Sequence, residues 1–406
     1  TIPYQLISKE EKDFLFFNYK FNCRICSGND LKRVLSLGFQ PLANNLEIKK
    51  NNFKTYPLEL NICNNCKNLQ LSIIPNFKNL FSKYNYKSSV SKSFSKHFYN
   101  AAQIYSKDLN LNKKSFIIDV GSNDGIGLIP FKHIGFKNLL GIEPAKNLAL
   151  ESRKKGLKIL NEFLTTKTSQ KIKRKADLIL ASNVFAHADN LEEMASCMIK
   201  LLKKNGNIIV EVQYLPRMLK DLTFDNIYHE HYNYWSLTSL VNFFNQFDAK
   251  IFKSERVDTH GGSIRIYIKK GKKIKIDTSV KQMLKEEEKF GIKKFKTYKD
   301  FGEKIYKIRD NVRRNIKKLK DKNKLIVGYG APAKATTALN FFGVSNEIKF
   351  IVEDNKLKHN KFIPGVKIPI KNKSNVKDKK NTLLVLAWNF FNDIKKNNKD
   401  LSNNII

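Results

Sequence analysis

The apolar positions of this chain first recur at a helical period and then gather into short runs. The helical pattern lies at Phe94, Phe98, Ala102, Tyr105 and Leu109. Residues at this spacing share one face, so we expect a helix with one buried side, and His97, off that face, should lie at the surface. Short apolar runs follow at 116–120, 139–142, 176–181 and 206–212. Strands that alternate with helical stretches predict an α/β fold with a mainly parallel sheet.

Two more apolar runs and a change of composition define the rest of the chain. The runs 249–252 and 263–268 predict further strands, so we expect about seven strands with an antiparallel closing pair. From 278 to 322 the sequence is rich in Lys and Glu, which predicts long exposed helices that link domains. A strand and a glycine turn then begin a third unit. We expect domains at 1–80, 81–275 and 276–406.

The charge of the chain is large but changes this picture little. The 406 residues contain 75 Lys and Arg against 37 Asp and Glu, a formal charge of +38. The lysines are spread over the whole length, as an AT-rich coding bias produces, so we interpret most of them as solvated surface. A basic surface would still attract an anionic substrate such as a nucleotide diphosphate. Because no apolar run approaches the roughly 20 residues of a membrane span and no secretory signal is evident, we expect a cytoplasmic protein without a membrane partner.

Four of the five cysteines form two CxxC pairs, Cys23 with Cys26 and Cys63 with Cys66. Each pair places two thiolates on one tight turn, and two such turns supply the four ligands of a tetrahedral zinc ion. Because protein ligands fill every position, the predicted zinc site is structural and closed. A redox dithiol is the alternative, disfavoured because neither pair opens a helix after a core strand. Cys197 lies in a helical pattern and is interpreted as a small core residue.

A glycine-rich turn after the strand at 116–120 predicts the cofactor. The turn reads Gly121-Ser-Asn123-Asp124-Gly125, and the next strand ends in Glu143, which could accept hydrogen bonds from both hydroxyls of a ribose. The turn departs from the dinucleotide pattern G-x-G-x-x-G, and Asp119 and Asp124 would repel a pyrophosphate. A positive sulfonium and an amino group suit these carboxylates better, so we expect S-adenosylmethionine rather than a dinucleotide.

The segment from 225 to 235 carries the densest chemistry of the chain. It contains Tyr228, His229, Glu230 and His231. An imidazole titrates near neutral pH and a carboxylate can orient it, so the segment can supply a general base beside hydrogen-bond donors. An aromatic-rich core is the alternative interpretation. His187, just after the strand at 176–181, lies at the edge where open α/β sheets bind ligands, and His260 is a weaker candidate.

The third unit repeats the combination of a strand and a glycine turn, at Gly328-Tyr-Gly330-Ala-Pro-Ala333-Lys334. The spacing Gly328-x-Gly330-x-x-Ala333 is a moderate dinucleotide fingerprint. A helix N-terminus with glycines can equally hold the diphosphate of a nucleotide sugar, with Lys334 adding positive charge.

Together these motifs resemble the S-adenosylmethionine-dependent C-methyltransferases of deoxysugar biosynthesis, which act on 4-keto sugars carried on thymidine diphosphate. The resemblance covers nearly the whole chain. It rests on the four paired cysteines and on Pro41-Leu-Ala-Asn44, Tyr84-x-Tyr86, Asp119-x-Gly121-Ser-Asn-Asp-Gly125, Gly141-Ile-Glu143, Asn183-Val-x-Ala-His187, Tyr228-His-Glu-His231, Gly261-Gly262-Ser-x-Arg265 and Gly328-Tyr-Gly-Ala-x-Ala-Lys334. It implies a zinc-binding N-terminal domain, a central class I methyltransferase Rossmann-like domain, and a C-terminal Rossmann-like α/β domain that helps hold the sugar nucleotide. Chains of this family often continue after 387–389 with a Gly-Gly turn and one more strand, which this sequence lacks.

The substrate class implied by the resemblance suggests a mechanism. A 4-keto group acidifies the carbon-three proton, so an enzyme need only remove it, stabilise the enolate and align the carbon with the sulfonium methyl. We expect His231 to be the general base, with Glu230 orienting an imidazole. Tyr228 would stabilise the enolate or share the proton transfer, and His187 would contact the sugar or the enolate. The residues expected to hold the cofactor are Asp119, Gly121, Asn123, Asp124, Glu143 and Tyr84. Those expected to hold the substrate are Tyr86, His229, Arg265, Gly330 and Lys334.

Two other functions fit parts of the sequence. A zinc-containing RNA methyltransferase would join a four-cysteine knuckle to a basic catalytic domain, but the zinc unit here is only moderately basic, so we expect no nucleic-acid partner. A nicotinamide-dependent or non-catalytic protein would use the Gly328-x-Gly330 turn. We expect a monomer or a weak dimer that binds a nucleotide sugar.

Overall fold

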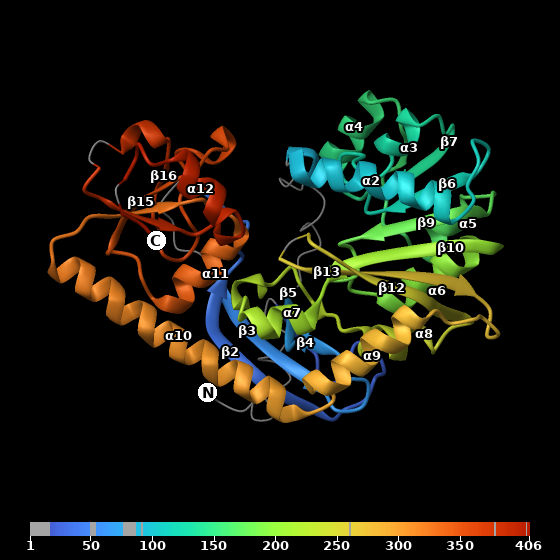
Figure 1. Ribbon diagram of the computed structural model, residues 1–406, viewed down its shortest axis with the longest axis horizontal. Helices are drawn as coiled ribbons and strands as arrows, with labels where there is room; N and C mark the ends of the chain where they lie inside the picture. Colours follow the sequence, from blue (N-terminus) through green and yellow to red (C-terminus); the bar gives the residue numbers. More distant parts are fainter. Residues whose placement is uncertain are drawn as a thin grey trace.

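The computed structural model describes residues 17–48, 54–75, 87–90, 92–259, 261–376, 379–402 and 404–406. Tyr84, Tyr86 and His260, three of the predicted site residues, lie outside this described part. The three larger sheets form an arch, in which the N-terminal sheet lies at the base between two α/β units (Figure 1).

The N-terminal sheet is antiparallel and takes one strand from far along the chain. Its order is β11-β4-β3-β2, and a small sheet beside it pairs β1 with β5. The strands are β1 Phe17–Tyr19, β2 Leu31–Pro41, β3 Thr55–Cys63, β4 Leu69–Leu71, β5 Ile73–Pro75 and β11 Asn233–Tyr234. Residues 225–235 are called the histidine segment below. β11 lies near the end of this segment and pairs antiparallel with β4. The histidine segment is therefore fixed to the N-terminal sheet.

The central sheet has the order β12-β13-β10-β9-β6-β7-β8, in which β13 runs antiparallel to both of its neighbours. The strands are β6 Phe116–Val120, β7 Asn138–Ile142, β8 Lys158–Leu160, β9 Ala176–Ser182, β10 Leu202–Gln213, β12 Ala249–Val257 and β13 Ser263–Lys270. Its helices are α2 Lys92–Asp108, α3 Ile129–His133, α4 Lys146–Lys154, α5 Thr166–Gln170, α6 Leu191–Leu201, α7 Leu215–Asp221 and α8 Leu237–Phe244. The predicted seven-stranded methyltransferase sheet with an antiparallel closing pair is confirmed.

Both faces of the central sheet are buried, which explains why its strands read as continuous apolar runs. In β6, Phe116 and Ile118 belong to the core on one face and Ile117 to the core on the other, because strand side chains alternate. Cys197 lies in the first of these cores, as predicted. The same core includes Cys23 and Ile25 of the N-terminal unit, so that unit is packed directly onto the central one.

The third unit is a parallel sheet with the order β16-β15-β14-β17-β18. Its strands are β14 Ile326–Tyr329, β15 Ile348–Val352, β16 Ile370–Lys371, β17 Thr382–Val385 and β18 Asn404–Ile405. Its helices are α11 Ala333–Phe342 and α12 Phe391–Asn397. Short 3-10 helices lie at Ser88–Val90, Phe224–Asn226, Lys356–Lys358, Lys373–Asn375 and Trp388–Phe390. The predicted Rossmann-like arrangement of strand, glycine turn and helix is present at β14 and α11. The expectation that the last strand after 387–389 is lacking is wrong, because β18 pairs with β17 without a Gly-Gly turn before it.

Two helices connect the central unit to the third, α9 Thr278–Phe290 and α10 Phe295–Asp321. Figure 1 shows α10 running along the outside of the N-terminal sheet. The prediction of exposed helices holds for one side of α10 only, because Tyr298, Phe301 and Ile305 are buried against the N-terminal sheet. Among the described residues, no helix combines the length and the apolar character that crossing a bilayer requires.

Helix α9 also holds the helix that follows the histidine segment. The Glu287 carboxylate is buried and accepts hydrogen bonds from Leu237 N (2.6 Å) and from Thr238 N and Oγ1 (2.8 and 2.6 Å). These donors belong to the first turn of α8, where main-chain N–H groups have no partner within the helix. Glu287 therefore anchors the end of the histidine segment.

We expect Glu287→Ala to lower the free energy of unfolding by about 1–3 kcal/mol, because buried donors lose their acceptor. Urea denaturation followed by tryptophan fluorescence measures the change. Glu288→Ala is the matched control, since its side chain is 64% exposed, and a surface change there should stay within about 0.5 kcal/mol. Equal stability of the two variants would contradict the anchoring role.

Candidate functional site

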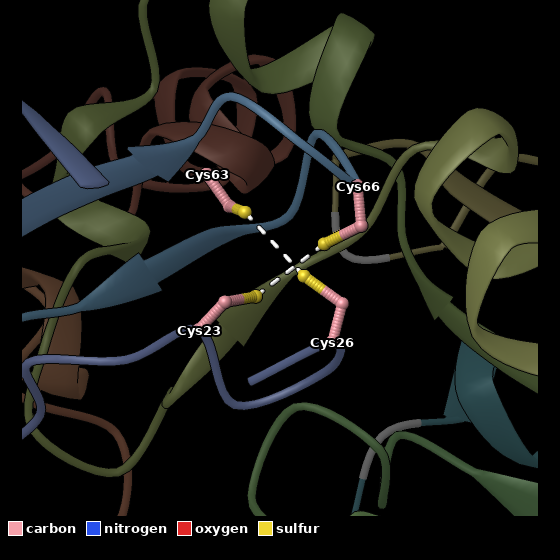
Figure 2. A group of neighbouring side chains, drawn as sticks. All are labelled: Cys23, Cys26, Cys63 and Cys66. Atoms are coloured by element: carbon pink, nitrogen blue, oxygen red, sulfur yellow. Dashed lines mark hydrogen bonds between the residues drawn. The ribbon is translucent and has the colours of Figure 1, made fainter. Parts of the chain in front are cut away.

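The four paired cysteines converge on one point (Figure 2). Their sulfur atoms all lie within 4.8 Å of one another, with Cys23 Sγ 3.3 Å from Cys66 Sγ and Cys26 Sγ 3.6 Å from Cys63 Sγ. Zn–S bonds of about 2.3 Å in a tetrahedron place the sulfurs about 3.8 Å apart, so the four side chains fit a zinc ion. Because all four ligands come from the protein, the site is closed, as a structural zinc site is.

Local backbone geometry explains why these two CxxC pairs form knuckles. Ser27 and Lys67 each follow the second cysteine of a pair in the left-handed conformation, with φ of 58° and 60°. Their N–H groups bond back to Cys23 O and Cys63 O. Burial raises the pKa of the Cys63 thiol to about 11. A bound zinc ion would favour its thiolate form.

The predicted cofactor turn lies at the carboxyl end of β6, beside the end of β7. Glu143 accepts hydrogen bonds from Asn123 N and Ala145 N, both at 2.8 Å. Each carboxylate oxygen keeps a lone pair for a further donor. Asp119 is buried just before Gly121, and burial, with a smaller contribution from Glu143, raises its pKa to about 8.

Asp124 occupies the same turn, and its carboxylate has partners within the protein. Its carboxylate is fully buried and accepts hydrogen bonds from Ser89 Oγ and from Lys155 Nζ, the latter at 3.3 Å. Lys155 follows α4, so the pair ties the turn to that helix. Lys155 compensates part of the Asp124 charge, and the contact of Asp124 with the cofactor stays a prediction.

Two imidazoles lie together at the end of β9. The ring centroids of His187 and His231 are 4.8 Å apart. His231 Nδ1 is 2.8 Å from Asn226 O, and its Nε2 is 2.7 Å from Tyr228 Oη. His187 Nδ1 is 2.6 Å from Glu230 O. A carbonyl only accepts, so both rings carry their proton on Nδ1 when neutral.

The environment of His187 keeps its ring neutral. Burial lowers the pKa of His187 to about 4, and the bond to Glu230 O opposes this only in part. Glu230 thus orients an imidazole through its main-chain carbonyl. Both oxygens of its carboxylate instead accept from Asn44 Nδ2, at 2.8 and 2.9 Å. Asn44 is a site residue that the sequence analysis quoted in a motif but assigned no task.

His229 is turned away from the imidazole pair. Its ring is buried against Tyr56, and its Nε2 lies 3.1 Å from Pro57 O in β3. Burial lowers its pKa to about 4, so a neutral His229 donates to this carbonyl. The structure places His229 between the histidine segment and the N-terminal sheet, and does not bring it to the expected substrate position.

Arg265 also has protein partners in place of the expected substrate. Its guanidinium bonds Glu211 at 2.9 and 3.1 Å and Glu255 at 2.8 Å.

His97 Nε2 lies 2.9 Å from the Glu211 carboxylate, and the His97 side chain is only 17% exposed. The expectation of a surface position for His97 is wrong, because α2 packs its second face against the ends of β10 and β13. Arg265 neutralises a buried carboxylate there.

The third unit meets the histidine segment through polar contacts. Trp388 Nε1 donates to the buried Asp225 carboxylate, and Thr337 Oγ1 donates to Ile227 O at 3.1 Å. Lys334 Nζ lies 4.6 Å from the Trp388 ring centroid, and burial lowers its pKa while Asp225 raises it. Lys334 is thus placed beside the histidine segment. Asp225 and Trp388 lie in segments that the sequence analysis singled out, but neither was among the predicted site residues.

The glycine turn of the third unit repeats the geometry of the cofactor turn. Gly121 N bonds Ile142 O at 2.8 Å, and Gly330 N bonds Val352 O at 2.7 Å. Glu353 follows Val352 as Glu143 follows Ile142, and accepts from Ala331 N and Asn355 N at 2.8 and 3.0 Å. Both glycines have positive φ, 69° and 89°. Glu353 is thus a second candidate for contact with ligand hydroxyls. The sequences of the two glycine turns differ, so their equivalence is visible only in the structure.

Three family models match the chain in succession. A zinc binding domain matches residues 23–81, a methyltransferase domain matches 95–254, and a C-methyltransferase C-terminal domain matches 258–404. The chain is also 30% identical over 394 residues to C-methyltransferase NovU of Streptomyces niveus, an alignment that covers 94% of this chain and 93% of that protein.

Solved structures of lower similarity cover part of the chain. A S-adenosylmethionine-dependent methyltransferase from Clostridium acetobutylicum is 15% identical with a TM-score of 0.37, over 44% of this chain and 92% of that one. Magnesium protoporphyrin IX methyltransferase from Synechocystis, with bound SAH, is 14% identical with a TM-score of 0.35, over 43% of this chain and 81% of that one. The fold assignment rests on the strand order and the family models rather than on these scores.

We expect Cys63→Ser to lose the zinc ion, because a hydroxyl is a poor replacement for one of four thiolates. Elemental analysis of the purified protein gives zinc per chain. Cys197→Ser is the matched control, since Cys197 is buried in α6 outside the sulfur cluster and should leave one zinc per chain. Full zinc content in Cys63→Ser would contradict a four-cysteine site.

Proposed function

Because this chain belongs to the S-adenosylmethionine-dependent sugar C-methyltransferases with a zinc-binding N-terminal domain, we propose that its substrate is a nucleotide-linked 4-keto deoxysugar. The methyl group would go to carbon three through an enolate. The observation that carries the proposal is the hydrogen-bonded pair of Tyr228 and His231 beside the neutral ring of His187. The alternative of an RNA methyltransferase is set aside, because the family acts on sugars.

His231 is suited to receive the carbon-three proton. Its Nδ1–H is committed to Asn226 O, so the basic lone pair is on Nε2. In the substrate the C–H bond breaks, its electron pair forms the enolate and the proton moves to His231 Nε2. The Tyr228 hydroxyl, now accepting from Nε2–H, would donate its own hydrogen to the enolate oxygen. A relay through Tyr228 ends in the same state, with the proton on His231.

His187 has a different task because it stays neutral. With Nδ1–H bonded to Glu230 O, its Nε2 can only accept a hydrogen bond. We therefore assign it to a hydroxyl of the sugar rather than to the enolate oxygen. The contact of Asn44 with Glu230 holds the main chain that carries His231 and whose carbonyl bonds His187.

The cofactor-binding residues follow from the turn after β6. Glu143 would accept from the ribose hydroxyls, and Gly121 and Asn123 would let the cofactor approach the backbone. Asp119, with its raised pKa, would ionise beside the positive sulfonium or amino group. When bound, S-adenosylmethionine supplies the methyl group and leaves as S-adenosylhomocysteine.

The nucleotide would lie against the third unit. Gly330 and the N-terminus of α11 offer main-chain N–H groups for a diphosphate, and Lys334 adds positive charge. Glu353, equivalent to Glu143, would accept from a hydroxyl of the nucleoside. The sugar would then project toward the histidine segment, which contacts this unit at Ile227 and Asp225.

Incubation with S-adenosylmethionine and a panel of nucleotide 4-keto sugars tests the proposed substrate. We expect mass spectrometry to show a gain of one CH₂ unit in a sugar nucleotide with a 4-keto group. The same sugars reduced at carbon four are the matched controls, because without the carbonyl the carbon-three proton is not acidic. Methylation of the reduced sugars, or of none in the panel, would overturn the proposal.

Exchange in D₂O with S-adenosylhomocysteine separates proton removal from methyl transfer. The wild-type chain should place one deuterium at carbon three, and His231→Gln should slow this exchange by roughly 10²–10⁴-fold, the usual size of general-base catalysis. Binding of S-adenosylhomocysteine, measured by calorimetry, should not change.

Two further variants divide the roles around His231. Tyr228→Phe should abolish exchange if the phenol relays the proton, and should leave exchange but slow methylation if it only stabilises the enolate.

The acidic limb of the pH–rate profile should not move in His187→Gln. His187, with a pKa of about 4, stays neutral until the pH falls below that value, so its protonation cannot produce a limb at higher pH. Unchanged exchange in His231→Gln would reject the assignment of the base.

A further inference from the structure

Arg24 lies between two zinc ligands, Cys23 and Cys26, yet its side chain reaches into the central unit. Arg24 Nη2 donates to Ala188 O at 3.1 Å and to Asp189 O at 2.9 Å, and it also meets the Asp189 carboxylate at 3.2 Å. These acceptors are the carbonyls of the two residues that follow His187. The zinc knuckle is thereby joined to the loop that carries a catalytic imidazole.

The carbonyl on the other side of His187 is held as well. Tyr232 N donates to Ala186 O at 2.6 Å. The Arg24 guanidinium lies 5.2 Å from the centroid of the Tyr232 ring, within the range of a cation–π contact. Arg24 therefore contacts the His187 loop on both sides of the imidazole. It bonds the carbonyls of Ala188 and Asp189 directly, and it packs on Tyr232, whose N–H bonds the carbonyl of Ala186.

The second knuckle supports the same arrangement. Tyr232 O accepts from Leu71 N in β4, the strand that follows Cys66. Arg24 N itself donates to Gln70 Oε1 at 2.9 Å, which ties the two knuckles together behind the guanidinium. The position of Arg24 thus depends on both CxxC turns being closed around one centre.

The burial of Arg24 argues against a chance surface contact. Its side chain is 4% exposed, and its Nε and Nη1 atoms have no hydrogen-bond partner among the described residues. Burying a guanidinium is costly, and Asp189, whose side chain is 67% exposed, compensates weakly. Four thiolates on one Zn²⁺ carry a formal charge of about −2, which would offset the buried cation at the neighbouring Cys23.

We propose that Arg24 is a positioning residue for His187, through which the zinc centre sets the geometry of the imidazole pair. The proposal rests on the proposed function for the task of His187, but the contacts themselves do not. Lysine is a poor replacement for arginine here, because its ammonium can donate to the carbonyls that Nη2 bonds but lacks the planar face that lies over the Tyr232 ring.

The test compares Arg24→Gln and Arg24→Lys with the control Arg33→Gln. Arg33 is on β2 of the N-terminal sheet, its side chain is 61% exposed and it pairs with Glu59. We expect both Arg24 variants to keep one zinc per chain and wild-type affinity for S-adenosylhomocysteine, while kcat falls about 10–100-fold with little change in KM. Arg33→Gln should keep wild-type kcat.

Asp189→Ala distinguishes carbonyl anchoring from a simple ion pair. The main-chain carbonyls of Ala188 and Asp189 remain in this variant, so kcat should stay within about twofold of wild type. A loss as large as that of Arg24→Gln would overturn the proposed anchoring. Loss of zinc in both Arg24 variants would also overturn the proposal, since Arg24 would then only support the knuckle.

Proton NMR of histidine-labelled protein provides a readout that needs no substrate. The His187 Nδ1–H bonded to Glu230 O should give a resonance protected from exchange. We expect this resonance to broaden or disappear in Arg24→Gln and to persist in Arg33→Gln. If no sugar nucleotide is methylated, the proposed function fails while this result still decides the role of Arg24. An unchanged resonance in zinc-loaded Arg24→Gln would reject that role.

Discussion

The main chain of the histidine segment is held by all three units of the molecule, and the two imidazoles depend on this constraint. β11 pairs with β4 of the N-terminal sheet, Tyr232 N bonds Ala186 O in the loop after β9, and Thr337 Oγ1 of the third unit bonds Ile227 O. These contacts come from the N-terminal, the central and the third unit, respectively. The distance between His187 and His231 is therefore a property of the whole assembly, and no unit alone contains the complete site.

Features that depend on local pattern could be predicted from the sequence. The alternation of apolar runs places the central strands within a few residues, and Asn190 before the apolar stretch of α6 marks the start of that helix. The spacing of Cys23, Cys26, Cys63 and Cys66 predicts the sulfur cluster, because CxxC turns have few stable geometries. The position of His187 after β9 follows from the parallel sheet, whose carboxyl edge collects such residues.

Contacts between units could not be predicted in this way. Asn44 with Glu230, Trp388 with Asp225 and Arg24 with the His187 loop join residues far apart in sequence, and a polar pair between units leaves no periodic signal. His97 shows the related error for helices: the apolar stripe of α2 predicts one covered face, while the contact of His97 with Glu211 covers another. Glu230 illustrates a third limit: its main-chain carbonyl orients the ring, and residue type carries no information about that.

The pairing of β4 with β11 also has a consequence for biosynthesis. β4 is made early, whereas the two residues of β11 leave the ribosome only after most of the central sheet has been translated. Until then the nascent zinc unit presents an unpaired strand edge, a surface prone to wrong pairing. Closure of that edge and docking of the histidine segment are the same event, so a chain that has completed its first sheet has also fixed the main chain beside His231.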